Sequence, residues 1–398
     1  MPTSFLEHAM SKPLPLFMLM VLFSPLAIDI FLPAIPQMAQ AFNVPVAWIA
    51  QTIPVFLFSF GIGQLLVGPL ADRYGRRPVA LVGALLYLAS SALAAIASSY
   101  ELLMLARLAQ GIAASCLSVA AFAGVRDVFG AERSKNIFSY LNGVICIVPA
   151  LAPLLGGVLT HWWSWAANFW FMVAFALVVF LALLFGLKET KPQANVFTGR
   201  LYSFSRYYSV ITVASFRFYS LLVMLGMAMI IGYVSQSAGR LMVDMQLSSA
   251  DYALWFGSNA AINIVAAFLA PQVIKQIGQT AGLWLGASLM AGAAIALVLG
   301  QQVLHPLAFM APVFVSSIGF CLLIAVGTGS ALAPFGDKAG TASALLGFVQ
   351  MTGSASLVGI LGLSGLANTE QLALLMALPF AAMMLAICKG GLRFETSN

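Results

Sequence analysis

The chain has 398 residues, of which 62% are hydrophobic and only 8% are charged, whereas about a quarter are charged in an ordinary soluble domain. A mean hydropathy of +0.99 excludes a water-soluble fold, because no such fold hides this much apolar surface. The net charge of +6 predicts no nucleic-acid partner, because in so apolar a chain the location of basic residues matters more than their sum.

Charge-free stretches predict twelve transmembrane helices. They are much longer than a barrel strand of about 10 residues and show no alternation of polar and apolar residues, which excludes an outer-membrane barrel. At about 20 residues per helix, the first six helices lie in four ranges. Residues 78–100 and 102–125 hold one helix each, 13–71 hold two that separate near 40–45, and 136–187 hold two that separate at 160–164. Six more are predicted in 218–239, 252–274, 276–336 (two, separating at 305–306), 339–369 and 371–388.

The predicted helices form two groups of six. We expect an N-terminal six-helix half at 1–187, a cytoplasmic linker at 188–215 and a C-terminal six-helix half at 216–398. This predicts an all-α membrane protein with twelve transmembrane helices in two pseudo-symmetric halves, an arrangement that one transporter fold shows.

The basic residues predict the orientation of the chain. With a cytoplasmic N-terminus, Arg240 is the only one of the 18 Lys and Arg residues in a loop on the outer side, and Arg107 and Arg217 fall within or at the edge of spans. Both termini are therefore expected inside. The basic residues on the predicted inner side are Lys12, Arg73, Arg76, Arg77, Arg126, Arg133, Lys135, Lys188, Lys191, Arg200, Arg206, Lys275, Lys338, Lys389 and Arg393.

Several segments carry motifs. The loop between the second and third spans reads G-P-L-A-D-R-Y-G-R-R at 68–77, the fourth span contains R-L-A-Q-G at 107–111, and the fifth contains P-A-L-A-P-L-L-G-G at 149–157. Two further segments are D-I-F-L-P-A at 29–34 and P-F-G at 334–336, the latter followed by A-G-T-A-S-A at 339–344.

The loop at 68–77 resembles the signature loop of the major facilitator superfamily. The fourth-span element is similar to the R-x-x-Q-G element of its proton-coupled members. The fifth-span element is similar to the G-P-x-x-G-G element of antiporters, although Ala152 stands where the broad pattern has Gly and Val148 stands at an earlier Gly. Together the segments resemble the Bcr/CflA subfamily of twelve-span bacterial drug/proton antiporters, which includes bicyclomycin and amphenicol exporters.

Asp29 is the only carboxylate inside any predicted span, and it lies about 22 Å along the first helix. An acid at membrane depth is a functional hypothesis by default, because it can exchange a proton as its surroundings change. Arg107 enters the fourth span at a similar depth, so the two side chains could pair, and the resemblance implies that Arg107 lies beside the proton site. The alternatives are a structural polar contact for Asp29 and an Arg107 that reaches the headgroups.

The signature loop is predicted to act in the conformational switch. Asp72 lies at the C-terminal end of a helix, where its negative charge interacts unfavourably with the macrodipole unless a positively charged partner compensates it. The resemblance implies a latch between the halves that holds one access state, and a simple positive-inside anchor is the alternative. The predicted switch residues are Gly68, Asp72, Arg73, Gly75, Arg76, Arg126 and Asp127.

The antiporter element is predicted to kink its helix at Pro149 and Pro153 and to allow close helix contact at Gly156 and Gly157, with plain packing as the alternative. A drug cavity also needs a few polar groups among apolar walls. The candidates for it, each of which could instead make an interhelical hydrogen bond, are Gln51, Gln110, Asn142, Cys146, Gln236, Asn259, Asn263 and Gln350.

No cofactor or metal is predicted, because the chain lacks a Gly-Lys phosphate loop and its three His residues are scattered. An enzyme is not expected, because no acid, base and nucleophile come together. The predicted function is proton-coupled multidrug efflux across the bacterial inner membrane, with amphenicol-type and other small apolar drugs as substrates. The resemblance implies that the protein works as a monomer. The alternative is proton-linked transport of an endogenous metabolite by the same fold.

Overall fold

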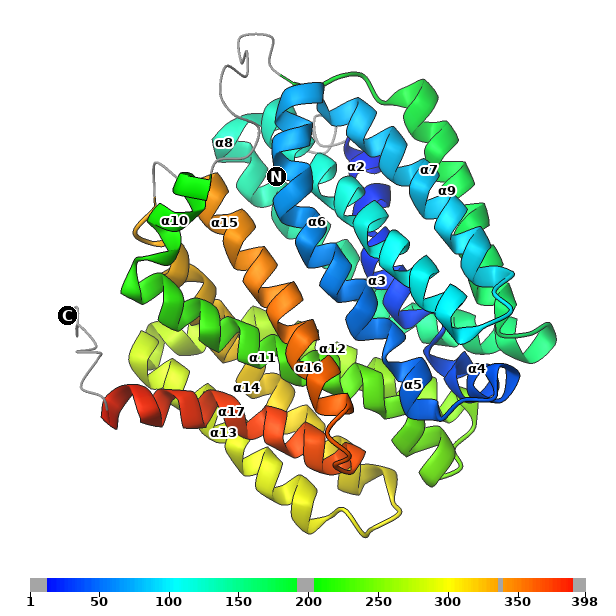
Figure 1. The fold of residues 1–398 in the computed structure, drawn as a ribbon. Coiled ribbons are helices and arrows are strands. Elements are labelled where there is room, and N and C mark those ends of the chain that lie inside the picture. Colours follow the sequence, from blue (N-terminus) through cyan, green and yellow to red (C-terminus); the bar gives the residue numbers. More distant parts are fainter. Residues whose placement is uncertain (1–12, 192–203, 336–338, 389–398) are drawn as a thin grey trace, which may run out of the picture. The chain divides into compact units, whose positions relative to one another are not determined.

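The computed structural model describes residues 13–191, 204–335 and 339–388, and the regular structure in these ranges is entirely helical (Figure 1). The middle of the predicted linker, Gly336 and five predicted inner-side residues lie outside the described residues. Those five are Lys12, Arg200, Lys338, Lys389 and Arg393.

Twelve helical segments of the described part are long and apolar enough to cross a membrane, which confirms the predicted fold class. The first six are Leu14–Phe42, Val46–Tyr74, Arg76–Ala95, Tyr100–Gly130, Tyr140–Trp162 and Ala166–Gly186. The other six are Ala214–Asp244, Ser249–Ile277, Gln279–Leu299, Pro306–Leu332, Gly340–Gly362 and Asn368–Cys388.

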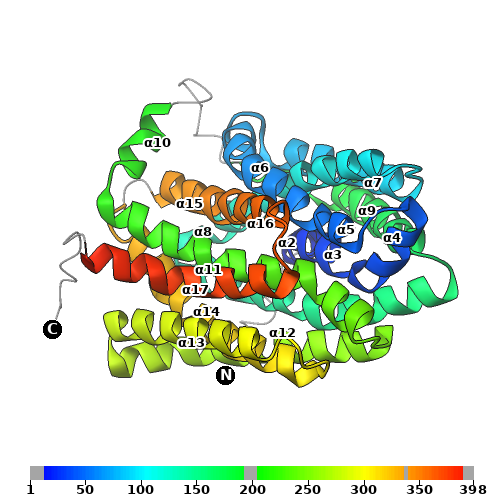
Figure 2. The same ribbon diagram turned by 60° about the horizontal axis from the view of Figure 1, so that its bottom comes forward.

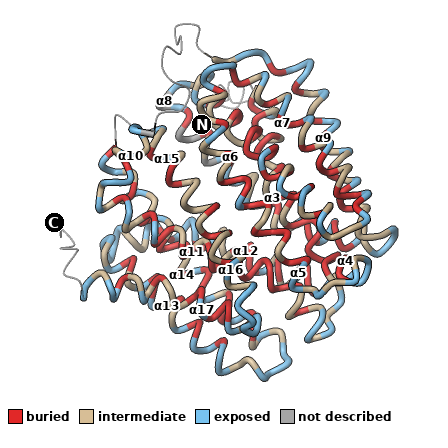
Figure 3. The backbone as a smooth tube through the Cα atoms, viewed as in Figure 1, coloured by how far each residue is buried: buried red, intermediate tan, exposed pale blue. Residues whose placement is uncertain are grey.

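Many of these helices expose large apolar side chains. Figure 3 shows the exposed stretches of the chain in pale blue. Phe185, Leu299 and Phe268 are 84%, 80% and 75% exposed. Contiguous apolar surface of this kind is unfavourable in water but is matched by lipid hydrocarbon. The exposed surface therefore agrees with the composition: the chain is a multi-pass membrane protein.

The chain divides into two compact units. The first comprises Met1–Pro45 and Val55–Ser203, and the second comprises Val46–Pro54 and Phe204–Asn398. The N-terminal end of the second span thus groups with the second unit, a discontinuity that the sequence did not predict.

The first span is not one straight helix. It consists of α2 (Leu14–Val21), α3 (Phe23–Asp29), a 3₁₀ turn η1 (Leu32–Ala34) and α4 (Ile35–Phe42). The helical hydrogen bonding is interrupted after Asp29, where Phe31 has ψ near 0° and Pro33 lacks a backbone donor. The predicted single helix is therefore broken at its acid.

The rest of the first unit is built from long helices. These are α6 (Thr52–Tyr74), α7 (Arg76–Ala95), α8 (Tyr100–Trp162) and α9 (Ala166–Gly186). Helix α8 contains the fourth and fifth spans and is interrupted at Gly130, whose φ of 72° is outside the helical region. Helix α7 packs on α8 and α9, and α2 and α3 pack on α8.

The second unit begins with the short α5 (Val46–Ala50) and resumes with α10 (Phe204–Ile211) inside the predicted linker. Its remaining elements are α11 (Ala214–Ala238), the π-helical η2 (Gly239–Asp244), α12 (Ser249–Ile277), α13 (Gln279–Leu299), α14 (Pro306–Leu332), α15 (Ala339–Phe348), the π-helical η3 (Val349–Gly353), α16 (Ser354–Gly362) and α17 (Asn368–Cys388). Helix α14 packs on α11, α12 and α13, and α17 packs on α11 and α13 (Figure 2).

Small residues allow a close helix contact in the second unit. A Cβ atom at Gly286 of α13 would meet the Gly319 carbonyl of α14, and one at Gly319 would meet the Gly286 carbonyl. The two backbones touch here because neither residue carries a side chain, as is common where membrane helices pack closely.

Candidate functional site

Asp29 lies at the break of the first span, as the last residue of α3. It is only 4% exposed, and it is the only buried carboxylate among the residues that the structure describes. An ionisable group in such a position is costly to keep and usually serves a function.

Arg107 is fully buried on α8 in the same unit. Its Nη1 donates to Gln110 Oε1 at 2.8 Å, and Gln110 Nε2 donates to Ser91 Oγ at 2.8 Å. The guanidinium carbon also lies 4.8 Å from the ring centroid of Phe31 and 4.7 Å from that of Phe56. Two aromatic faces and an amide oxygen therefore stabilise the cation.

The ion pair suggested for Asp29 and Arg107 is not among the ion pairs of the described residues. Phe31, two residues beyond Asp29, instead lies against the guanidinium, and the Gln110 amide takes one of its N–H groups. The acid and the cation are thus connected through the broken segment. Sequence reasoning missed Phe31, Phe56 and Ser91, because apolar and small residues in a span carry no distinguishing pattern.

The antiporter element packs on the same break. A Cβ atom at Gly156 of α8 would overlap the carbonyl oxygen of Ile30, the residue that follows Asp29. Thr160 Oγ1 donates to the Gly156 carbonyl at 2.7 Å, and Asn168 Nδ2 donates to Thr160 Oγ1 at 2.8 Å. Gly156 therefore brings the backbone of α8 against the backbone beside the acid.

The remaining residues of that element lie along the same helix. Pro149 and Pro153 are both inside α8, and Pro153 and Gly157 are buried.

The signature loop is organised around Arg76, the first residue of α7. Its Nε donates to Asp127 Oδ2 at 2.7 Å, and its Nη1 lies 2.9 Å from Asp72 Oδ1 and donates to the Ala71 carbonyl at 2.7 Å. The Asp127 side chain is 12% exposed, whereas that of Asp72 is 58% exposed. One arginine thus joins the end of α6, the start of α7 and the part of α8 just before Gly130.

Glu189, just beyond α9, supports this loop and was missed by the sequence reasoning. Its carboxylate accepts the backbone N–H groups of Arg76 at 2.9 Å and Arg77 at 3.2 Å, at the first turn of α7. Glu189 and Arg76 are more than a hundred positions apart in the chain, so no local sequence pattern predicts their contact. A carboxylate at a helix N-terminus also complements the macrodipole.

Hydrogen bonding decides the ionisation of Glu189. Partial burial raises the pKa of Glu189. The hydrogen bonds from the backbone N–H groups of Lys191, Arg76, Arg77 and Thr190 together lower the pKa by more than burial raises it, so the pKa lies below the ordinary value of 4.5. The carboxylate form is the one that the loop stabilises.

The other predicted switch residues lie around this centre. Gly75 has φ +105°, which favours glycine. Arg73 lies over the Tyr74 ring at 5.4 Å, Gly68 borders open space, and Arg126 is exposed.

The predicted cavity residues of the second unit do not form one group. Asn259 Oδ1 accepts from Ser317 Oγ at 2.9 Å, and Asn263 accepts from Cys321 Sγ, so both connect α12 to α14. These contacts agree with the alternative interpretation as interhelical hydrogen bonds. Gln350 lies in η3, and its carbonyl accepts from Ser354 Oγ.

Gln51 and Gln236 do meet, together with Gln371, which the sequence reasoning missed. Gln236 Nε2 donates to Gln371 Oε1 at 3.4 Å, and all three glutamines line a cavity of about 30 Å³. In the first unit, Gln110 contacts Arg107, whereas Asn142 and Cys146 are exposed. No cluster of three metal-binding side chains occurs among the described residues.

The fold and its buried charged groups define a multi-pass helical membrane protein, and comparison with known proteins identifies its family. A model described as Major Facilitator Superfamily matches residues 17–359, and the chain belongs to this family of transporters. It is 33% identical over 380 residues to a multidrug resistance protein, MdtL, of Shewanella oneidensis, covering 93% of this chain and 94% of that protein. It is 30% identical to MdtL of Escherichia coli O157:H7, covering 89% of each.

Solved structures share the fold. A D-xylose–proton symporter matches with a TM-score of 0.75 and 14% identity, covering 94% of this chain and 96% of that one. A human organic anion transporter matches with a TM-score of 0.61 and 20% identity, covering 94% and 99%.

Gly156→Ala is expected to lower stability by about 1–3 kcal/mol, because the added methyl group overlaps the Ile30 carbonyl and forces the two backbones apart. Thermal unfolding of the purified protein in detergent measures the effect. Gly143→Ala is the matched control, because it lies on the same span and a Cβ atom there meets nothing within 4 Å. Equal midpoints for both variants would contradict the close contact.

Glu189→Gln is expected to destabilise the protein by about 0.3–1 kcal/mol at neutral pH, through loss of the charge at the start of α7. The folded pKa is below the unfolded one, so this contribution is complete above the unfolded pKa and disappears as the pH falls through the folded pKa. The difference between wild type and variant should therefore shrink below pH 4.5. Unfolding as a function of pH tests this, with Asp244→Asn as a control because Asp244 lies at the end of η2 and not in a first helical turn. A difference between wild type and Glu189→Gln that does not change with pH argues against the capping role.

Proposed function

We propose that the protein is a proton-driven multidrug exporter of the Bcr/CflA type, which moves amphenicol-type and other small apolar drugs outward by alternating access. Two observations on the sequence support multidrug efflux: the relatives at 30–33% identity are named multidrug resistance proteins, and the alignments cover nearly the whole chain. We propose a transporter without enzymatic activity, cofactor or metal, driven by the proton gradient.

The observation that carries proton coupling is the position of Asp29. It is buried where the first span is broken, and no other carboxylate in the described part of the chain is buried. A break leaves the backbone less regular than a continuous helix, so the surroundings of the acid can change with the conformation of the span. We assign the proton to Asp29 on this ground.

Arg107 is proposed as the cation that tunes this acid. Its guanidinium contacts the Phe31 ring, so a rearrangement of the break changes the distance between the two charges. Gln110 and Phe56 also contact the guanidinium and help to hold the cation in place. Drug binding or hydration at the break would then change the proton affinity of Asp29.

One proton per cycle supplies enough free energy for a neutral drug. Moving one charge through 100 mV yields about 2.3 kcal/mol, and one pH unit yields about 1.4 kcal/mol. Together they sustain roughly a 500-fold gradient of an uncharged solute. A single carboxylate is therefore sufficient.

The proposed setting is the bacterial inner membrane, with both termini in the cytoplasm and a monomer as the working unit. The inner side is assigned by the excess of Lys and Arg in the loops of that side. The partners are drugs, protons and the lipid bilayer. The halves 1–187 and 216–398, joined by 188–215, are proposed as the two moving parts.

The signature loop is proposed as part of the switch between access states. Arg76 connects Asp72 and Asp127, and the Asp72 side chain remains largely exposed. Asp72 can therefore change partners while Arg76 stays held by Asp127. Glu189 keeps the start of α7 in place during this change.

Asp29→Asn is expected to abolish proton-coupled drug transport and leave the protein folded. Inside-out vesicles are given a chloramphenicol-type amphenicol while internal pH is monitored. Drug should enter wild-type vesicles against its gradient as protons leave, and the variant should match protein-free vesicles in both signals. Asp244→Asn, an exposed acid in the second unit, should behave as wild type.

Uncoupler-sensitive accumulation at the wild-type level by Asp29→Asn would remove Asp29 from the mechanism. Drug movement without proton flux in wild type, or no movement of any tested drug, would favour the metabolite transporter instead.

Asp72→Asn is expected to slow turnover by up to about fivefold with little change in drug affinity, because an exposed ion pair contributes about 0–1 kcal/mol. Initial rates in vesicles and equilibrium drug binding in detergent separate the two effects. Asp244→Asn is the matched control, because Asp244 forms an exposed i,i+4 pair with Arg240 just as Asp72 does with Arg76. A loss of drug affinity with unchanged turnover would place Asp72 in binding rather than switching.

A further inference from the structure

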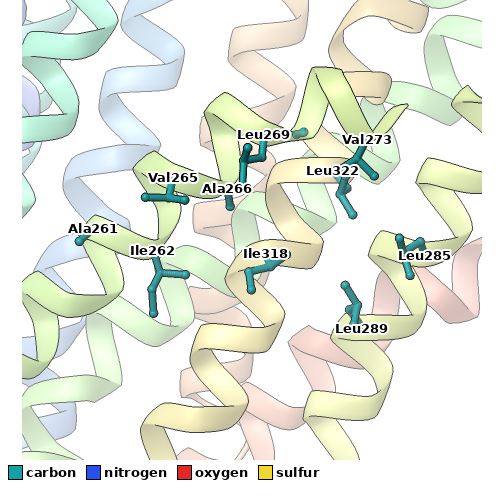
Figure 4. Close-up of a pocket in the computed structure, with 11 residues that line it drawn as sticks. Ala261, Ile262, Val265, Ala266, Leu269, Val273, Leu285, Leu289, Ile318 and Leu322 are labelled. Atoms are coloured by element: carbon teal, nitrogen blue, oxygen red, sulfur yellow. The ribbon is translucent and has the colours of Figure 1, made fainter. Parts of the chain in front are cut away.

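The second unit contains an apolar groove between α12, α13 and α14. Its volume is about 510 Å³, and its wall is formed by aliphatic side chains alone (Figure 4). Helices α12 and α13 follow each other in the chain but make few mutual contacts, because α13 packs mainly on α14 and α17. The groove is the space left between them, over α14.

Small residues give the groove its depth. Ala266 and Ala270 of α12 are buried and pack with Leu322 of α14 in one cluster, so the floor lies close to the helix backbones. Val265 of α12 and Leu285 of α13 are exposed and form opposite parts of the rim. The groove is therefore open on one side, where its aliphatic wall is exposed.

The groove has the length of one leaflet. The lining residues of α12 run from Ala261 to Val273, which is about 18 Å at 1.5 Å per residue. Half of a hydrocarbon core of about 30 Å is about 15 Å. A hydrocarbon chain that fills the groove would thus extend through one half of the bilayer.

A few polar residues follow the end of the groove at Val273. An adjoining space of about 330 Å³ is lined by Lys275 of α12, Gln279 of α13 and Ser330 of α14, together with apolar residues. Lys275 is exposed, and no carboxylate of the described residues forms an ion pair with it. The amine is therefore available to an anion at the level where lipid headgroups begin.

We propose that this groove binds one anionic glycerophospholipid of the inner leaflet, with an acyl chain along α12 and the phosphate at Lys275. The apolar slot of leaflet length and the basic residue at its end together match the two parts of such a lipid. The choice of leaflet rests on the membrane orientation given under Proposed function. The site itself does not depend on which substrate the protein transports.

The first test measures lipid selectivity. The delipidated full-length protein in detergent is titrated with palmitoyl-oleoyl phosphatidylglycerol or with the zwitterionic phosphatidylcholine of the same chains, and bound lipid is counted by native mass spectrometry. The wild type should bind one phosphatidylglycerol about fivefold more tightly than phosphatidylcholine, and Lys275→Gln should lose this preference. Lys188→Gln, an exposed lysine of the first unit, should keep it.

The second test measures whether lipid binding requires an open groove. Ala261 and Ala267 are both exposed on α12, but only Ala261 lines the groove. Ala261→Phe should weaken the binding of both lipids, whereas Ala267→Phe should change neither. Because both alanines are exposed, both variants are expected to fold, and thermal unfolding checks this.

Equal affinities of the wild type for the two lipids, an unchanged preference in Lys275→Gln, or equal effects of the two Ala→Phe variants would each overturn the proposal. Displacement of phosphatidylglycerol by chloramphenicol at this site, or its replacement by a second copy of the chain, would assign a different occupant. Failure of drug transport in vesicles with lipid selectivity intact would overturn the proposed substrate and leave the lipid site standing.

Discussion

A helix that breaks inside a membrane leaves backbone groups without intrahelical partners, and hydrocarbon cannot satisfy them. The first span breaks directly after Asp29, and Ile30, Phe31 and Leu32 are completely buried. Protein therefore has to enclose this segment, and the absence of a side chain at Gly156 lets α8 do so at backbone distance. The buried acid, the aromatic contact of Arg107 and the antiporter element all meet at this one enclosed break.

Arg76 and Arg107, the two buried arginines among the described residues, are held in different ways. Arg76 contacts two carboxylates and a carbonyl at short distances, which largely neutralises and fixes it. Arg107 contacts an amide oxygen and two aromatic faces, which stabilise a cation without cancelling its charge. The contacts of Arg76 suit a structural centre in which one partner can be exchanged. The positive charge of Arg107 is not cancelled, so its electrostatic potential can act on a nearby acid.

The two proposals use separate parts of the molecule. The proposed proton coupling depends on the break in the first span, and the proposed lipid site depends on α12, α13 and α14 of the second unit. Small residues are decisive in both places, since glycine lets backbones touch and alanine leaves a slot beside them. Both proposed sites therefore depend on small residues, as is common where membrane helices pack closely.

The sequence by itself determined the twelve helices and the family, because hydrophobic length is a local property and the signature loop is a contiguous motif. It also singled out Asp29, since one carboxylate in an apolar span is conspicuous. Only the tertiary structure decided what surrounds that acid: the break at Phe31, the contact with Gly156 and the aromatic support of Arg107 depend on residues far apart in the chain. The contact of Glu189 with the start of α7 could not be predicted either, because the two residues are 113 positions apart and local sequence does not encode such a helix cap.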